Sequence, residues 1–230
     1  MREVEVKYRI QDPEALLATL KALGIELGPP IGQDDQAYAP GGWSYGDDRQ
    51  GVPFARLRTT DGRHVFTLKR PAENLLSCEE HETDITDRDQ MHAAIVAMGF
   101  RPTVRIVKMR RTGAYRDMLL CVDELSELGW FLEVERMVSG DVPGEAVQAE
   151  LCRFVESLGV AAERTEQTYD WLVRHACAAM RPGNDEAQAR MGRALRSLDQ
   201  NSVAGMLAAA GSEARRPGDG RSVKPAVSAE

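Results

Sequence analysis

The sequence has little cysteine, few aromatic residues and no long apolar run. Its four cysteines, Cys78, Cys121, Cys152 and Cys177, form no C-x-x-C pair, so a disulfide-dense scaffold and a zinc ribbon are both excluded. No apolar stretch approaches the roughly 20 residues that a membrane-spanning helix needs. The first 20 residues carry charges throughout, beginning with Arg2, Glu3, Glu5 and Lys7, which is unlike the apolar stretch of a secretory leader. We therefore expect a cytoplasmic protein with reduced thiols and no membrane partner.

Positive charge is also in deficit. The chain has 29 Lys and Arg against 36 Asp and Glu, which gives a net charge of −7. Duplex nucleic acid requires a basic binding face, so we expect no nucleic-acid partner. The content of 43% hydrophobic and 28% charged residues is typical of a globular domain. A length of 230 residues suits one large domain or a domain with an extension.

Four segments combine helical periodicity with capping residues. Asp12 is a typical N-cap residue, Pro13 suits the first helical position and Gly24 ends the apolar pattern. Asp87 begins a second segment that Gly99 ends. The predicted helices span residues 12–24, 87–98, 143–158 and 167–180.

Eight shorter segments have the alternating or β-branched pattern of strands. They span residues 2–10, 33–39, 54–60, 64–70, 78–86, 103–112, 116–124 and 130–138. Asp61 and Gly62 form a typical hairpin turn between the third and the fourth segment. This order predicts an α+β fold dominated by an antiparallel sheet. Eight strands are enough to close into a small barrel.

The amino-acid composition of the chain changes near residue 177. Residues 181–230 lack Phe, Trp and Tyr and are rich in Ala, Arg, Gly and Ser. A helix is predicted over 185–210, and the segment after it has the composition of a disordered tail. We therefore expect one domain over 1–176 and a partly helical extension over 177–230.

Charged and apolar residues alternate inside the predicted strands. In Glu3-Val4-Glu5-Val6-Lys7, one face of the strand is ionic and the two valines fill the other face. Similar rows recur, basic at 56 and 58 and at 108 and 110, acidic at 80 and 82 and at 133 and 135. A solvated sheet face would explain any single row. Rows that are sorted by sign favour ionic faces that line the inside of a closed barrel.

Such a barrel would collect charges of both signs in one lumen. The carboxylates are Glu3, Glu5, Glu80, Glu82, Asp123, Glu133 and Glu135, and the cations are Lys7, Arg56, Arg58, Lys69, Lys108 and Arg110. Burying these charges without ligands would exceed the roughly 5–15 kcal/mol that keeps a domain folded. Arg and Lys suit phosphoryl oxygens, and clustered carboxylates suit Mg²⁺ or Mn²⁺. A polyphosphate bound together with a divalent metal satisfies both groups.

The sequence resembles the CYTH superfamily, the triphosphate tunnel metalloenzymes. The N-terminal run matches the family's E-x-E-x-K motif, and later runs follow the family's order over about residues 1–175. These runs are Arg56-Leu57-Arg58, Thr67-Leu68-Lys69, the Glu80 and Glu82 pair, Lys108-x-Arg110, Asp123 and Leu128-Gly129-Trp130-Phe131-Leu132-Glu133-Val134-Glu135. The resemblance implies an eight-stranded antiparallel tunnel, a triphosphate-containing substrate and a divalent metal.

The resemblance and the chemistry together suggest a role for each ionic residue. Glu5, Glu133 and Glu135 are expected as metal ligands, with further or water-mediated contacts from Glu3, Glu80, Glu82 and Asp123. Phosphate binding is expected from Lys7, Arg56, Arg58, Lys69, Lys108 and Arg110. Within that set, Lys7, Arg58, Lys108 and Arg110 are expected to stabilise the charge of the reacting phosphoryl group.

Three functions fit this resemblance. In the first, ATP is cyclised to cyclic AMP with release of pyrophosphate, as in the class IV adenylyl cyclases of the superfamily. In the second, tripolyphosphate, thiamine triphosphate or a nucleoside triphosphate is hydrolysed. The third is a non-catalytic module that binds polyphosphate or nucleotide. The chain length, the long loop after residue 38 and the Leu-Gly-Trp-Phe-Leu-Glu-Val-Glu run favour the cyclase, a branch in which homodimers are common.

Two further features have alternative interpretations. Trp43 and Tyr45 lie in a Gly-rich loop over 41–53, where they could stack on a nucleobase or anchor the loop. Arg105 has the opposite strand parity to Lys108, so we expect it on the outer face of the barrel.

Overall fold

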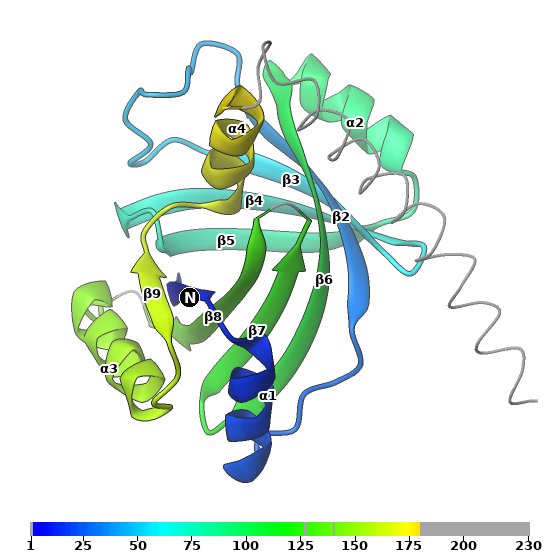
Figure 1. Cartoon of the computed structure of the whole chain (residues 1–230). Coiled ribbons are helices and arrows are strands. Elements are labelled where there is room, and N and C mark those ends of the chain that lie inside the picture. Colours follow the sequence, from blue (N-terminus) through cyan, green and yellow to red (C-terminus); the bar gives the residue numbers. More distant parts are fainter. Residues whose placement is uncertain (1, 127, 140, 180–230) are drawn as a thin grey trace, which may run out of the picture. The chain divides into compact units, whose positions relative to one another are not determined.

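A computed structural model describes residues 2–126, 128–139 and 141–179 (Figure 1). The barrel strands are β1 (Arg2–Ile10), β2 (Ile31–Pro40), β3 (Phe54–Thr60), β4 (Arg63–Asn74), β5 (Ser77–Ile85), β6 (Phe100–Tyr115), β7 (Met118–Leu125) and β8 (Gly129–Val138). A further short strand is β9 (Ala162–Thr165). The helices are α1 (Pro13–Ala22), α2 (Arg88–Ala97), α3 (Gly144–Ser157) and α4 (Tyr169–Ala179). All eight predicted strands are present, as are the four helices predicted to begin before residue 170.

The strands form one antiparallel sheet that closes on itself. Its order is β5-β4-β3-β2-β6-β7-β8-β1, and β5 also pairs with β1. The closing pairs join Arg2 with Glu79 and Val4 with Ser77. The predicted α+β fold with a closed eight-stranded barrel is therefore confirmed.

The ninth strand, which the sequence did not predict, shares one edge of β1 with β5. β5 pairs with β1 from Arg2 to Val4, and β9 pairs with it from Lys7 to Ile10. The sequence of β9 is Ala-Glu-Arg-Thr, which has no alternating apolar pattern. These four residues form a strand because they pair with the part of β1 that β5 does not cover, and their own composition does not favour one.

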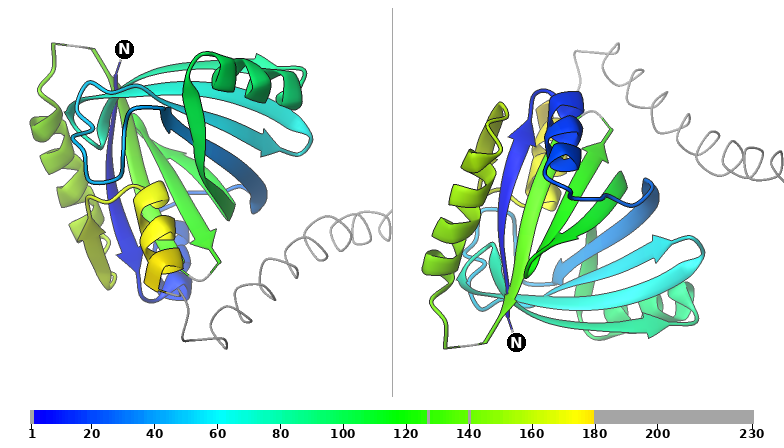
Figure 2. Two further views of the ribbon diagram at one scale, coloured as in Figure 1. Left: turned by 90° about the horizontal axis from the view of Figure 1, so that it is seen from above. Right: turned by 90° about the horizontal axis from the view of Figure 1, so that it is seen from below.

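The apolar faces of the strands point outward and are covered by helices. Val4 and Val6 of β1 are fully buried in a cluster that α1 and α3 complete. A second cluster joins Ile95 of α2 to Leu57 of β3 and Tyr38 of β2. Figure 2 shows α3 beside β1 and α2 on the other side of the barrel. Because the apolar side of each strand faces the helices, the ionic side faces the lumen.

Local signals explain where the helices begin. The Asp12 carboxylate accepts a hydrogen bond from the Ala15 amide at 3.0 Å, and Asp87 accepts from the amides of Asp89 and Gln90. No helix in the described part of the chain is both long enough and apolar enough to cross a membrane.

The expected domain boundary at 176/177 falls inside α4, which continues to Ala179. The helix expected over 185–210 and the tail after it lie outside the described residues.

Candidate metal and phosphate site

The lumen is a cavity of about 430 Å³ to which all eight barrel strands contribute side chains. Twelve of the thirteen predicted ionic residues line it: Glu3, Glu5, Lys7, Arg56, Arg58, Lys69, Glu80, Glu82, Lys108, Arg110, Glu133 and Glu135. The alternation of charges along the strands thus has its origin in the alternation of inward and outward side chains.

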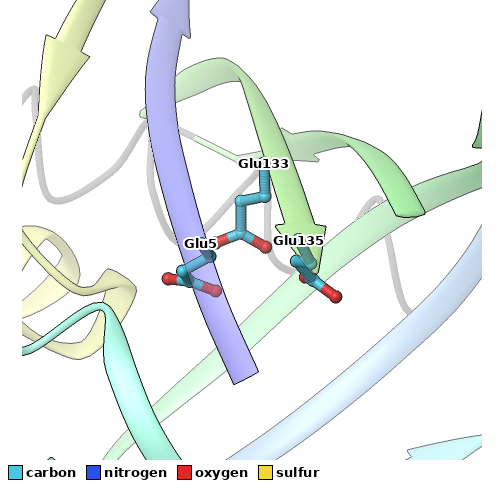
Figure 3. Close-up of side chains that lie close together, drawn as sticks. All are labelled: Glu5, Glu133 and Glu135. Atoms are coloured by element: carbon cyan, nitrogen blue, oxygen red, sulfur yellow. The ribbon is translucent and has the colours of Figure 1, made fainter. Parts of the chain in front are cut away.

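Three of the carboxylates form a compact cluster. Glu5 of β1 lies directly opposite Glu135 of β8, and Glu133 is the next inward residue on β8. One carboxylate oxygen from each residue lies within 4.8 Å of the others, and the three side chains lie close together (Figure 3). Burial and the nearby Glu133 raise the pKa of Glu5 to about 7, and burial together with Glu3 raises that of Glu135 to about 8.

Glu133 behaves differently because two cations contact it. The Lys7 ammonium lies 3.0 Å from one of its oxygens, and the Arg110 guanidinium contacts the other. Although burial opposes ionisation, these cations hold the pKa of Glu133 well below its usual range. The cluster therefore combines one ionised carboxylate, Glu133, with two whose raised pKa values disfavour ionisation in the absence of a bound cation. Three carboxylate ligands of this kind fit a hard divalent ion such as Mg²⁺ or Mn²⁺.

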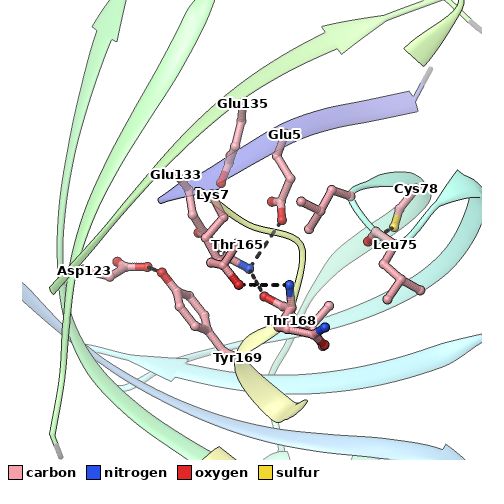
Figure 4. A network of polar contacts seen from close by, with 12 residues as sticks. Glu5, Lys7, Leu75, Cys78, Asp123, Glu133, Glu135, Thr165, Thr168 and Tyr169 are labelled. Carbon is pink, nitrogen blue, oxygen red and sulfur yellow. Dashed lines mark hydrogen bonds and ion pairs between the residues drawn. The ribbon is translucent and has the colours of Figure 1, made fainter. Parts of the chain in front are cut away.

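Lys7 connects the cluster to the C-terminal part of the domain. Its ammonium lies 3.6 Å from Glu5, donates to the Gln167 carbonyl at 3.4 Å and sits 4.3 Å from the centre of the Tyr169 ring (Figure 4). The side chain is 3% exposed. Lys7 is thus fixed in position before any substrate binds.

Two cations of β6 are held from behind by Asp123, which is fully buried. Asp123 accepts hydrogen bonds from Lys108 at 3.0 Å, from Arg110 at 2.5 and 2.6 Å and from the Tyr169 hydroxyl at 2.9 Å. Asp123 is the one predicted ionic residue that is missing from the described cavity lining. Burial and the adjacent Arg110 lower the pKa of Lys108, and the two cations outweigh burial to lower that of Asp123.

A second carboxylate of this type, Asp35 of β2, was missed in the sequence. It accepts two hydrogen bonds of 2.7 Å from the guanidinium of Arg58 and is 3% exposed. Burial alone would raise its pKa, but the bonds from Arg58 lower it to about 2. Asp35 shares strand parity with Gln33 and Ala37, which also line the lumen. That parity was the available signal.

The remaining ionic residues pair around Lys69. Its ammonium lies 2.9 Å from Glu3 and 2.9 Å from Glu80. Arg56 lies 3.5 Å from Glu80 and 3.4 Å from Glu82, whose side chain is half exposed. This part of the lumen is more open to solvent than the carboxylate cluster.

Helix α4 and the loop between β2 and β3 contribute residues that sequence reasoning did not identify. The Tyr169 ring lies 4.3 Å from the Lys7 ammonium and 4.7 Å from that of Lys108. Arg49 from the loop donates to Thr168 and Asp170, both at 3.1 Å. A single ring or guanidinium inserted from a helix or a loop leaves no periodic pattern in the sequence.

The structure bears on two alternatives from the sequence. Trp43 is 7% exposed, donates to the Asp48 carbonyl at 3.1 Å and packs edge-on against Phe54 and Tyr45, which is typical of a loop anchor, while Trp43 and Tyr45 also line the lumen. Arg105 pairs with Asp34 at 2.8 Å and has a 59% exposed side chain, as expected for the outer face.

The closed barrel, its inward ionic rows and its carboxylate cluster define a tunnel-type β-barrel protein. The chain belongs to the CYTH domain family, whose model matches residues 1–169. CYTH enzymes are metal-dependent and bind triphosphate substrates such as ATP.

Known relatives agree with this assignment. A protein of Methanocaldococcus jannaschii that is provisionally named an adenylate cyclase is 29% identical over 165 residues, which cover 71% of this chain and 93% of the relative. A provisionally named adenylate cyclase of Vibrio parahaemolyticus has a similar structure, with a TM-score of 0.63, 21% identity and coverage of 75% of this chain and 97% of that one. A Hippeastrum protein, described as having a dominant triphosphatase activity, gives a TM-score of 0.52 at 18% identity, with coverage of 76% and 96%.

Proposed function

We propose that this protein is a metal-dependent enzyme that cyclises ATP to cyclic AMP and releases pyrophosphate. The observation that carries the proposal is the position of Glu5, Glu133 and Glu135, whose oxygens lie within 4.8 Å in a lumen that is also lined by Lys7, Arg56, Arg58, Lys69, Lys108 and Arg110. A triphosphate with a bound divalent cation is complementary to both parts of that lining. The M. jannaschii relative's name supports the choice of cyclisation.

The cations of the lumen would bind the phosphates. Arg58 and Arg110 are each fixed by two hydrogen bonds that they donate to a buried carboxylate, and Lys108 is fixed by one that it donates. Because these groups are already oriented, they can stabilise charge on the phosphoryl oxygens without reorganising. Arg56 and Lys69 lie in the more open part of the lumen, where the other end of the triphosphate would bind.

Glu5, Glu133 and Glu135 would hold the divalent ion. When bound, such an ion polarises a phosphoryl oxygen and lowers the pKa of an attacking hydroxyl. Lys7 would keep Glu133 ionised and in place, as its 3.0 Å contact indicates. In the cyclisation, the bond from O3′ to the α-phosphorus forms and the bond from that phosphorus to the bridging oxygen breaks. The hydroxyl proton passes to solvent, and pyrophosphate leaves with the bonding electrons.

Hydrolysis of a triphosphate is the second candidate. Trp43 and Phe54 line the lumen, pack edge-on against each other and lie beside the Arg49 guanidinium. Arg49 covers part of both rings, which leaves less ring surface for stacking on adenine and favours a substrate without a base. The activity described for the Hippeastrum protein points the same way. A non-catalytic binding module is the third candidate, and the complete set of inward carboxylates argues against it.

A product assay separates these candidates. The full chain is incubated with ATP or with tripolyphosphate in the presence of Mg²⁺ or Mn²⁺, and the products are identified by chromatography. Cyclic AMP together with pyrophosphate supports cyclisation. Faster release of orthophosphate from tripolyphosphate would show that the function is hydrolysis and not cyclisation. No turnover of either compound would favour the non-catalytic binding module. Glu135→Gln serves as the control that separates site-dependent turnover from contamination.

A further inference from the structure

Glu5 occupies a break in the hydrogen bonding of the sheet. The free edge of β1 pairs with β5 up to Val4 and with β9 from Lys7 onward. In a strand, the N–H and C=O of one residue point to the same edge. Glu5 directs both of these groups into the gap between the two partner strands.

Partners from outside the regular ladder fill this gap. The Glu5 amide donates to the Leu76 carbonyl at 2.9 Å, and the Glu5 carbonyl accepts from the Gln148 side chain of α3 at 3.1 Å. Gln148 is 6% exposed although it is a polar residue on a helix. An amide buried to this degree requires its hydrogen bonds.

Gln148 is itself held by the β4–β5 hairpin. Its amide group exchanges hydrogen bonds with that of Asn74, donating at 3.3 Å and accepting at 3.0 Å. The Asn74 oxygen also accepts from the Leu76 amide at 3.0 Å. Asn74, Gln148 and the Glu5 backbone therefore form a continuous amide clamp across the break.

The clamp borders a second cavity on the outer side of the barrel. An outer cavity of about 490 Å³ is lined by Asn74, Leu76 and Gln148, and Leu76 also lines the lumen. Without the clamp, water from the outer cavity could reach the Glu5 carbonyl. On this edge of β1, the Glu5 backbone would then be held by the hydrogen bond to the Leu76 carbonyl alone.

We propose that Gln148 is a positioning residue for the metal site, because it fixes the backbone of Glu5 and so keeps the Glu5 carboxylate within reach of Glu133 and Glu135. This inference rests on the proposed function, in which that cluster binds the metal. Three carboxylates that ionise to bind a cation repel one another, so a fixed Glu5 backbone keeps the Glu5 carboxylate beside the other two while the cation binds.

The test measures the dissociation constant of Mn²⁺ for the full chain, using electron paramagnetic resonance to detect free Mn²⁺. The melting temperature of each variant is measured in parallel. Gln148→Met keeps the length of the side chain and removes the donor, and it is expected to weaken Mn²⁺ binding about tenfold. Asn74→Ala removes the hydrogen bonds between Asn74 and Gln148 but keeps the one from Gln148 to the Glu5 carbonyl, so a smaller weakening of Mn²⁺ binding is expected. Glu145→Gln, one turn earlier on the same helix and in the same outer cavity, is the control and should bind Mn²⁺ like the wild type.

The possible outcomes distinguish the clamp from the metal site. A residue with a structural role only would lower the melting temperature and leave the Mn²⁺ dissociation constant unchanged. Equal Mn²⁺ binding by the wild type, Gln148→Met and Asn74→Ala, measured below their melting temperatures, would overturn the role of Gln148 while the metal site stands. Failure of the wild type to bind Mn²⁺ would overturn both. If Gln148→Met does not fold, Asn74→Ala decides.

Discussion

Glu5 and Glu135 lie directly opposite each other on adjacent strands, with both carboxylates inside the lumen. Like charges in directly opposed positions destabilise a sheet. The third carboxylate, Glu133, adds to this repulsion, and its own charge is compensated by Lys7 and Arg110. The arrangement is costly in the metal-free protein and favourable once a divalent cation binds.

Replacement of one of these carboxylates should therefore change stability in opposite directions with and without metal. At a pH above about 8, where Glu135 is ionised, Glu135→Gln is expected to raise the melting temperature of the metal-free protein by about 2–4 °C, which corresponds to about 1 kcal/mol. The same variant should lose the stabilisation that Mn²⁺ gives the wild type. Differential scanning calorimetry with and without Mn²⁺ measures both effects.

The control for this experiment is Glu82→Gln, because Glu82 lines the lumen outside the cluster and its side chain is half exposed. This variant should keep the Mn²⁺-dependent stabilisation. Loss of that stabilisation in Glu82→Gln but not in Glu135→Gln would assign the metal to the other part of the lumen.

The same residues predict a pH dependence. The folded-state pKa values of Glu5 and Glu135 are raised from 4.5 to about 7 and about 8. A raised folded-state pKa gives stability that is complete below the unfolded value and is lost as the pH rises through the folded value. The metal-free protein should therefore lose stability between about pH 4.5 and pH 8.

Urea unfolding at a series of pH values measures this loss. Mn²⁺ should reduce it, because the bound cation favours the ionised carboxylates, and Glu135→Gln should also make the profile flatter. A metal-free wild type whose unfolding free energy is constant over this range would contradict the raised pKa values.

Much of this site could be predicted because its charged residues occupy alternate positions of the strands, which places them on one face of the sheet. The bounds predicted for the first strand match β1, and the inward rows of β3, β5, β6 and β8 follow from alternation alone. Asp35 was missed, although its parity was available, because the flanking Gln33 and Ala37 are not charged and no ionic row is visible.

Other features could not be predicted because they depend on contacts between distant segments. β9 pairs with a strand more than 150 residues earlier in the sequence, and its four residues carry no strand pattern. Tyr169 and Arg49 enter the site from a helix and a loop, where side-chain direction depends on packing. The role of Gln148 could not be predicted, because its hydrogen bond to the Glu5 carbonyl depends on the gap between β5 and β9.

The ion pair between Asp35 and Arg58 predicts two separable effects of mutation. Arg58→Ala should lower the unfolding free energy by about 3–5 kcal/mol, because it leaves the Asp35 carboxylate buried without its partner. It should also raise KM for the triphosphate about tenfold or more, since a charged phosphate contact is lost.

The double variant Asp35→Leu/Arg58→Met distinguishes these effects. An apolar pair should recover most of the stability, because burying two charges is itself costly. KM should remain high in the double variant. Recovery of a normal KM together with stability would show that Arg58 acts on the fold and does not contact the phosphate.

The hydroxyl of Tyr169 is predicted to stabilise the buried Asp123. Tyr169→Phe removes a hydrogen bond of 2.9 Å to a carboxylate and keeps the ring beside Lys7 and Lys108. The expected loss is about 1.5–3 kcal/mol in urea unfolding, since the bond involves a charged acceptor. Tyr115→Phe, which changes a ring stacked on Phe154 instead, should cost less. Equal losses in the two variants would contradict a special role for Tyr169.

The most direct test of the account is anomalous diffraction from crystals of the full chain soaked with Mn²⁺. The account predicts a manganese peak in the lumen within about 2.2 Å of carboxylate oxygens of Glu5, Glu133 and Glu135, and no peak there in crystals of Glu135→Gln. A peak elsewhere in the wild-type lumen, or none when the crystals are saturated with Mn²⁺, would contradict the assignment of these three residues as the metal site.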